Sequence, residues 1–180
     1  MKKLLLILLC LPMIGFGQSL IETQDWISEK ISIYGTFTEE TVEFGFIKRI
    51  TNVFFDDNKK HIIITNSTRY YESNIVLGAK YTIPINFIKN VSLSKNYGDG
   101  YVYLKITTFS NNKICMSTVS SFDSALTILN FENSTECDPS LNKCKIKMSN
   151  DVLGKNLDDR FNKAFEKLIE LYGGLKNETF

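Results

Sequence analysis

The stretch that decides the fold lies near the C-terminus, from Asn156 to Gly174, and reads NLDDRFNKAFEKLIELYGG. Its apolar residues recur every three or four positions, which is the period of one helical face. They are Phe161, Ala164, Phe165, Leu168, Ile169 and Tyr172. Asn156 is placed to cap this helix, and Gly173 is typical of a helix end. The stretch therefore predicts a long amphipathic helix whose apolar face packs against the protein's own core.

The chain before this helix carries mostly strand patterns. A first helix is expected from Leu20 to Ile33, with Thr23 as its cap and Trp26 as an anchor in the core, followed by a linker over 35–40. From Thr41 onward, apolar residues alternate with polar ones or gather in β-branched runs. The sequence Gly98-Asp99-Gly100 is a hairpin signal. Extended segments are expected at 60–66, 80–87, 90–95, 101–109, 113–119 and 144–148, and Pro84 in the second of these suits an edge or a bend. Residues 124–131 fit either a helix or a strand, and we assign them to a strand.

About seven strands between two helices predict an α+β protein. We expect an antiparallel sheet that closes on itself as a barrel or sandwich, with a short N-terminal helix and the long amphipathic helix at an open end. This order, over about Thr41 to Tyr172, resembles the pleckstrin-homology-like barrel. The tail RFNKAFEKLIELYGG, together with DWISEKI, is similar to a group of small uncharacterised secreted bacterial proteins. The resemblance implies a fold and names no functional residue.

The N-terminus MKKLLLILLCLPMIGFGQ has the composition of an export signal. Lys2 and Lys3 precede a short apolar run that ends in small residues, so we expect a signal peptide over 1–17 with cleavage after Gly17. A retained anchor is the alternative, and lipidation at Cys10 is disfavoured because leucines precede it. The expected organisation is then an N-terminal helix and linker over 18–40, a barrel with its helix over 41–174 and a tail over 175–180. The mature protein would be periplasmic or extracellular and would not span a membrane.

Charge is balanced along the chain. The 21 basic residues, less Lys2 and Lys3 of the signal, leave 19 against 20 acidic residues. No basic run is visible in the sequence, which argues against nucleic acid as a partner. The basic residues near the first strands, Lys48, Arg49, Lys59 and Lys60, are scattered beside two aspartates. That arrangement argues against phosphoinositide binding.

Three cysteines remain after signal cleavage: Cys115, Cys137 and Cys144. Export favours disulfide formation, and the turn-rich residues between Cys137 and Cys144 predict a bridge between these two. Cys115 lies in a strand-like segment and is expected to be a small buried apolar residue. A single His and the lack of a CxxC pair predict no metal site and no cofactor.

No catalytic residue is predicted. A hydrolytic triad would have to use His61, the only histidine, and no GxSxG sequence accompanies it. The adjacent carboxylates at Asp56-Asp57 and Asp158-Asp159 are typical of turns and helix starts.

Tyrosines form the least ordinary feature of the sequence, because most of them gather between residues 70 and 103. A partner-binding face is predicted from four of them: Tyr81, Tyr97, Tyr101 and Tyr103. The alternative is that they support the core. The sequence thus predicts an exported, non-enzymatic binding or interaction module whose partner is another envelope protein or an extracellular ligand. A carrier of a small apolar ligand inside the barrel is the second hypothesis.

Overall fold

The computed structural model describes residues 19–96, 101–109, 114–121 and 141–173. They contain two α-helices, two short 3-10 helices and eight strands. In chain order these are α2 (Leu20–Gly35), β1 (Phe37–Thr41), β2 (Gly45–Asp56), β3 (His61–Tyr70), β4 (Ile75–Pro84), η1 (Ile85–Phe87), β5 (Ile88–Lys95), β6 (Val102–Thr108), β7 (Cys115–Ser121), β8 (Lys143–Met148), η2 (Asn150–Lys155) and α3 (Leu157–Leu171).

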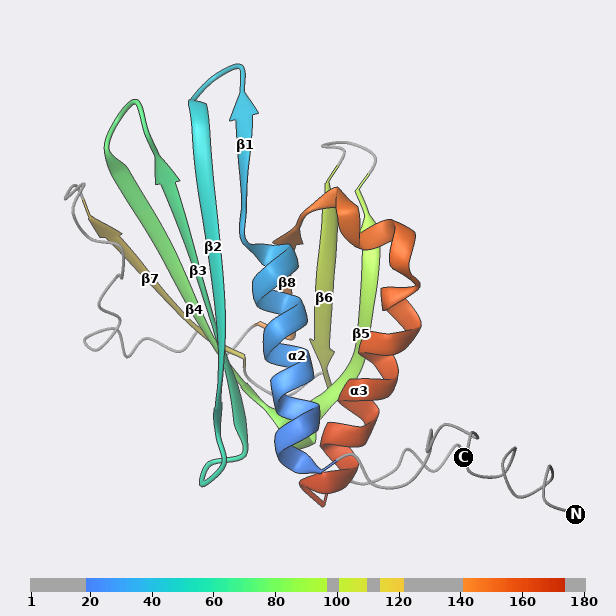
Figure 1. Ribbon diagram of the computed structural model, residues 1–180. Helices are drawn as coiled ribbons and strands as arrows, with labels where there is room; N and C mark the ends of the chain where they lie inside the picture. The colour runs from blue at the N-terminus through green and yellow to red at the C-terminus, as the bar shows by residue number, and fades with distance from the viewer. Residues whose placement is uncertain (1–18, 97–100, 110–113, 122–140, 174–180) are drawn as a thin grey trace, which may run out of the picture.

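The described strands form two antiparallel sheets rather than a closed barrel. One sheet has five strands in the order β1-β2-β3-β4-β7, and the other has three in the order β5-β6-β8 (Figure 1). The change of sheet occurs at Pro84, which ends β4 and has no N–H to continue its pairing. The 3-10 turn η1 then leads the chain into β5 of the second sheet. The antiparallel α+β class is confirmed, and the single self-closing sheet is wrong because the chain bends at Pro84.

The helix α2 begins one turn earlier than the cap predicted at Thr23. Ser19 is the cap, because its hydroxyl accepts from the backbone N–H of Glu22 while the Glu22 carboxylate accepts from the N–H of Ser19. The helix has 16 residues against 15 in α3, so it is not short. The expected linker after it is also wrong, since most of that range is β1, paired along its length with β2.

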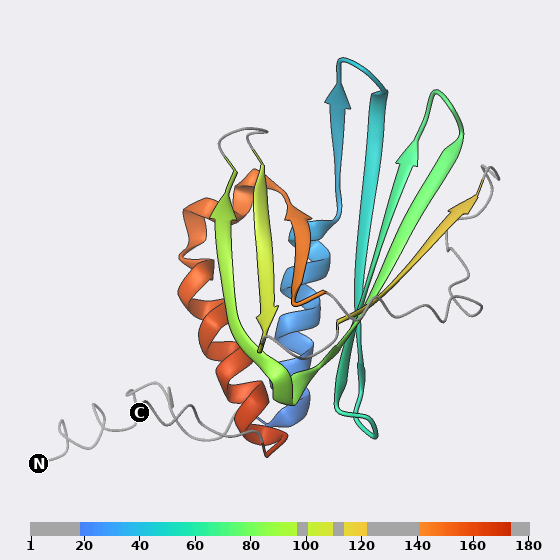
Figure 2. The ribbon, with the colours of Figure 1, turned by 180° about the vertical axis from the view of Figure 1, so that it is seen from behind.

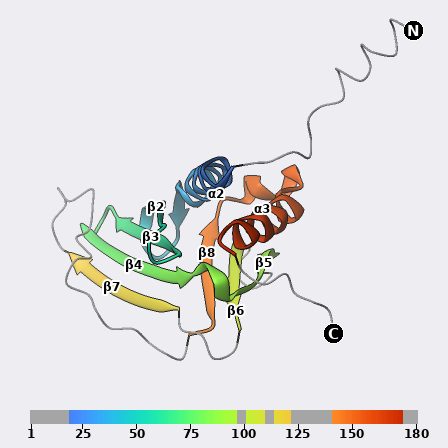
Figure 3. The same ribbon diagram turned by 90° about the horizontal axis from the view of Figure 1, so that it is seen from below.

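The apolar stripe of α3 is confirmed as core. Phe161, Phe165 and Leu168 are at most 1% exposed, and Phe161 meets Trp26 of α2 edge-on with ring centroids 5.3 Å apart. Both helices lie on one face of the three-stranded sheet, and α2 also contacts β2 (Figure 3). The helix α3 therefore covers a sheet face and closes no barrel end. Its cap differs from the prediction, because Asn156 is left-handed and makes no side-chain bond to the helix.

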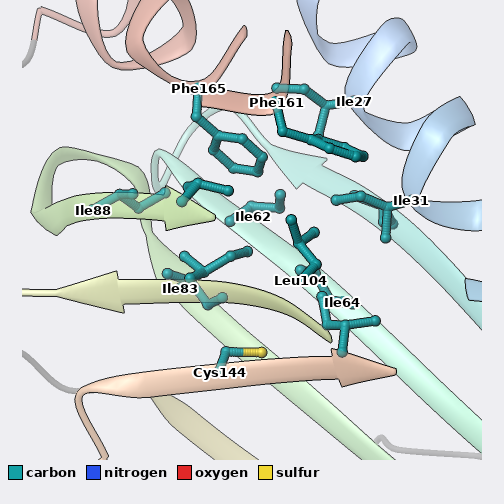
Figure 4. Packing of buried hydrophobic residues seen from close by; sticks show 14 of the residues in the cluster. Ile27, Ile31, Ile62, Ile64, Ile83, Ile88, Leu104, Cys144, Phe161 and Phe165 are labelled. Carbon is teal, nitrogen blue, oxygen red and sulfur yellow. The ribbon is translucent and has the colours of Figure 1, made fainter. Parts of the chain in front are cut away.

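The core is a single cluster that joins the two sheets and both helices. Isoleucines dominate it, and side chains from α2, β3, β4, β5, β6, β8 and α3 meet there (Figure 4). A hydrogen-bonded group closes the cluster at one end. Tyr172 Oη donates to Asp57 Oδ1, and Gln24 Nε2 contacts both the Asp57 Oδ1 (2.7 Å) and the Tyr172 Oη (2.6 Å). Burial, together with the Asp57 carboxylate, raises the pKa of Tyr172 to about 12. This group ties the end of α3 to α2 and the β2–β3 turn.

The cysteines are not arranged as predicted. Cys144 is a free thiol with 0% exposure, because on β8 it alternates to the core side with Ile146 and Met148. The predicted Cys137–Cys144 bridge is therefore wrong at its Cys144 end, and Cys137 lies outside the described residues. Cys115 is half-buried on β7, so it is not the fully buried apolar residue that was expected.

We expect the Cys144 thiol to be unreactive in the native protein. Burial raises the pKa of this thiol well above its usual range, and a buried thiol offers neither access nor thiolate. A chromogenic disulfide reagent should label Cys144 only after denaturant is added. The variant Ile33→Cys is the reference, because residue 33 is 53% exposed on α2 and should react at once. Recovery of Cys144 in a disulfide-linked peptide would contradict this prediction.

Several expected features lie outside the described residues. They are the signal peptide, Tyr97, the turn at Gly98–Gly100, the strand over 124–131, Cys137 and the tail over 175–180. The strands β5 and β6 on either side of the expected turn do pair as antiparallel neighbours.

Candidate functional site

A cleft of about 370 Å³ opens between the two sheets. Strands β2, β3 and β4 of the first sheet supply one wall, strands β6 and β8 of the second supply the other, and the end of α2 joins them. The lining residues are Gly35, Arg49, Thr51, Asn66, Ser67, Thr68, Leu77, Gly78, Ala79, Tyr81, Tyr103, Lys145 and Lys147. The volume lies in the range of ligand pockets, and most of the lining side chains are polar or charged.

Two of the predicted tyrosines meet in this cleft. Tyr81 reaches it from β4 and Tyr103 from β6, so the two come from different sheets. Both are half-buried, and burial raises the pKa of Tyr81. Tyr81 is thus a neutral phenol at ordinary pH, and its hydroxyl can donate or accept a hydrogen bond.

Tyr101 lies beside the cleft in a different role. The Lys147 Nζ is 3.0 Å from the centroid of its ring, and Tyr101 also makes a side-chain hydrogen bond with Glu39. Tyr101 therefore does not line the cleft; it contacts Lys147, which does, and holds that side chain in place. The predicted set is divided: Tyr81 and Tyr103 line the cleft, Tyr101 backs it, and Tyr97 lies outside the described residues.

An ion-pair cluster holds the two walls together. Glu39 of β1 accepts from Arg49 Nε at 2.8 Å and from Lys147 Nζ of β8 at 3.0 Å, and Arg49 Nη1 also donates to Thr68 Oγ1 at 3.0 Å. Burial alone would raise the pKa of Glu39. The hydrogen bonds from Lys147, Arg49 and Tyr101 outweigh it, so the pKa of this carboxyl lies below its ordinary value. Glu39 is the residue that joins β1 of one sheet to β8 of the other.

The cationic character of this site was not predicted from the sequence. Lys143, Lys145 and Lys147 alternate along β8 with core residues, so all three project from the face away from the core. Lys105 of β6 lies directly opposite Lys145, and side chains directly opposite share a face. The linear sequence showed no basic run, because the lysines alternate with apolar residues and come from two strands. The signal available was the pattern KCKIKM, read at a period of two.

The other candidates for chemistry are not brought together. His61 is half-buried at the start of β3, and burial is the main reason that its pKa is lowered, with Asp56 acting in the opposite sense. In the described ranges, no group of three or more His, Cys, Asp or Glu side chains is placed to hold a metal ion. The helices of those ranges also lack the combination of length and hydropathy that crossing a bilayer requires.

Comparison with known proteins adds no assignment. No protein-family model, no curated protein and no solved structure matches this chain.

Proposed function

We propose that this protein is an exported, non-enzymatic binding module and that the cleft between its two sheets is the binding site. The observation that carries the proposal is that Tyr81 and Tyr103, which come from separate sheets, line a single cleft of about 370 Å³. Tyrosine offers a large contact area with little loss of conformational freedom and a polar tip for orientation. Around them, Asn66, Ser67 and Thr68 add hydrogen-bonding groups.

Export is part of the proposal and rests on the N-terminal sequence. Lys2 and Lys3, the apolar run and the small residues before Gln18 are the features of a cleaved signal. The partner would then be another envelope protein or an extracellular ligand. An intact mass that starts at Gln18, measured on protein from its own host, would support export, and a mass that includes Met1 would oppose it. The resemblance to pleckstrin-homology-like secreted proteins is part of the same proposal.

The second hypothesis, a carrier of a small apolar ligand inside a barrel, has weaker support. The described strands form two sheets whose shared interior is filled by the isoleucine-rich core cluster. The cleft that does open between them is lined by Arg49, Lys145 and Lys147 among other polar groups. An apolar ligand would leave these charges without water or a counterion, which is costly.

The variant Tyr103→Ala tests the proposal, because it removes one aromatic wall of the cleft. Wild type and variant are compared against an immobilised panel of neutral and acidic oligosaccharides, peptides and a fatty acid. We expect at least one polar panel member to bind wild type and to lose tenfold or more in affinity with Tyr103→Ala. Stacking and hydrogen bonding by one tyrosine are worth about 1–3 kcal/mol, which corresponds to such a loss.

Tyr71→Ala is the matched control. Tyr71 is 44% exposed just after β3 and does not line the cleft, so its loss should leave binding unchanged. Both variants must keep the melting temperature of wild type. Binding that is insensitive to Tyr103 would remove the cleft as the site, and binding of the fatty acid alone would favour the carrier.

A further inference from the structure

Among the described residues, the cleft and the sheet face beside it carry an excess of positive charge, which the balanced composition of the chain conceals. Four lysines share the outer face of the three-stranded sheet, and we call them the lysine face: Lys105, Lys143, Lys145 and Lys147. Arg49 of the other sheet lines the same cleft as Lys145 and Lys147. Strands β5, β6 and β8 contain no Asp or Glu at all. Within the described residues, Glu39 is the carboxylate paired with this group of five cations.

The position of Lys105 shows that these lysines do more than protect a sheet edge. Strand β8 is an edge strand of its sheet, and lysines on edge strands prevent unwanted pairing with other chains. Strand β6, however, is the central strand, so Lys105 has no edge to protect. Lys105 also lies directly opposite Lys145, and like charges in that position destabilise a sheet. An arrangement that costs stability and protects no edge points to a binding role for the charge.

Part of the lysine face is also open in the described part of the protein, whereas the Lys147 side chain is 15% exposed and pairs with Glu39. The helices α2 and α3 lie on the other face of the three-stranded sheet, so the lysine face is turned toward the viewer of Figure 2. Lys143 and Lys145 are exposed, whereas Val102, Leu104 and Ile106 on the core side are fully buried. Successive lysines of β8 are about 7 Å apart, because each strand residue advances the chain about 3.4 Å. An extended ligand with repeated negative charges could follow them into the cleft.

We propose that the ligand of the cleft is an acidic saccharide, a sugar chain that carries carboxylates; this rests on the proposed function and narrows it. Lysine ammonium groups would pair with the carboxylates, and charge-assisted hydrogen bonds of this kind are the strong ones. Asn66, Ser67 and Thr68 provide partners for sugar hydroxyls, and the rings of Tyr81 and Tyr103 provide flat surfaces for the sugar ring. A purely anionic polymer would need only the lysines, whereas a neutral sugar would need only the tyrosines and the polar groups. An acidic saccharide would contact all three kinds of group: the lysines, the polar side chains and the tyrosine rings.

The test uses oligogalacturonate and its methyl ester, which are the same sugar chain with and without charge. Binding of each is measured by titration calorimetry to the full mature protein. We expect wild type to bind the acid at least tenfold more tightly than the ester, with affinity falling as salt is raised. Single-stranded DNA is included as a polyanion that lacks the carboxylated sugar, and it should bind more weakly than oligogalacturonate.

The variant Lys145→Glu should weaken oligogalacturonate binding tenfold or more. Its fold should be at least as stable as wild type, because the new carboxylate faces Lys105 and replaces repulsion with attraction. Lys163→Glu is the matched control: it makes the same change of charge on the exposed face of α3 and should leave binding within twofold. If the lysine face binds no carboxylate, the two variants will behave alike.

The outcomes separate this inference from the proposed function. Equal binding of acid and ester, both lost in Tyr103→Ala, would overturn the acidic ligand and keep the cleft as a binding site. DNA binding equal to that of oligogalacturonate would replace the saccharide with a general polyanion. No binding of either saccharide would reject the inference, and the wider panel would then judge the cleft by itself.

Discussion

Replacing Phe161 with alanine should lower the free energy of unfolding by about 3–5 kcal/mol. Phe161 is fully buried where α3, α2 and the sheets meet, and its ring is in edge contact with Trp26. Its removal would leave a cavity that both helices border. Neither helix can move to fill that cavity unless the other moves with it, so most of the cavity would remain. Urea denaturation followed by the fluorescence of Trp26, the only tryptophan of the chain, measures the loss directly.

Leu171→Ala is the control for this experiment. Leu171 is the last residue of the same helix and is 38% exposed, so its truncation removes apolar surface without opening a cavity. We expect it to cost less than about 1 kcal/mol. A loss at Phe161 no greater than that at Leu171 would mean that α3 is not part of the cooperative core.

The second large effect is expected from Glu39→Gln, which should cost about 2–3 kcal/mol at neutral pH, the scale of a hydrogen bond to a charged group. The amide keeps the shape of Glu39 and removes the charge that both Arg49 and Lys147 contact. The side chains of Glu39 and Lys147 are 10% and 15% exposed, so water replaces the lost partner poorly. The two sheets would lose the ion pair that joins β1 to β8.

The effect of Glu39→Gln should depend on pH. The pKa of Glu39 is lowered in the folded protein, so its contribution to stability is present above the unfolded pKa of about 4.3 and is lost as pH falls through the folded value. The difference between variant and wild type should therefore be full at pH 7 and vanish in strong acid. Glu40→Gln is the matched control, because Glu40 is the exposed neighbour and has no ion pair in the described residues. A difference that persists unchanged in acid would show that charge is not the cause.

The sequence by itself determined both helices, most of the strands and the faces that these elements bury; β1, which lies in the range predicted as a linker, is an exception among the described strands. The 3.6-residue period of Phe161, Phe165 and Leu168 predicted α3 and its buried face, because a helix can bury a stripe in only one direction. The two-residue period of Val102, Leu104 and Ile106 predicted the core side of β6 in the same way, and all three are fully buried. The antiparallel α+β class followed from the order of these elements.

Tertiary structure alone decided how the strands divide and what they bring together. Pro84 by itself favours an edge or a bend over a central strand. No short window of sequence shows which strands the chain joins after that bend, so the division into two sheets was not predicted. The same limit applies to Cys144, since a face, and not a distance along the chain, decides whether a thiol can be bridged. The cleft follows the same rule. It brings together two pairs that are far apart in sequence: Tyr81 with Tyr103, and Glu39 with Lys147. Each pair depends on two sheets packing across a shared core, and no short window of sequence contains the long-range contacts of that core.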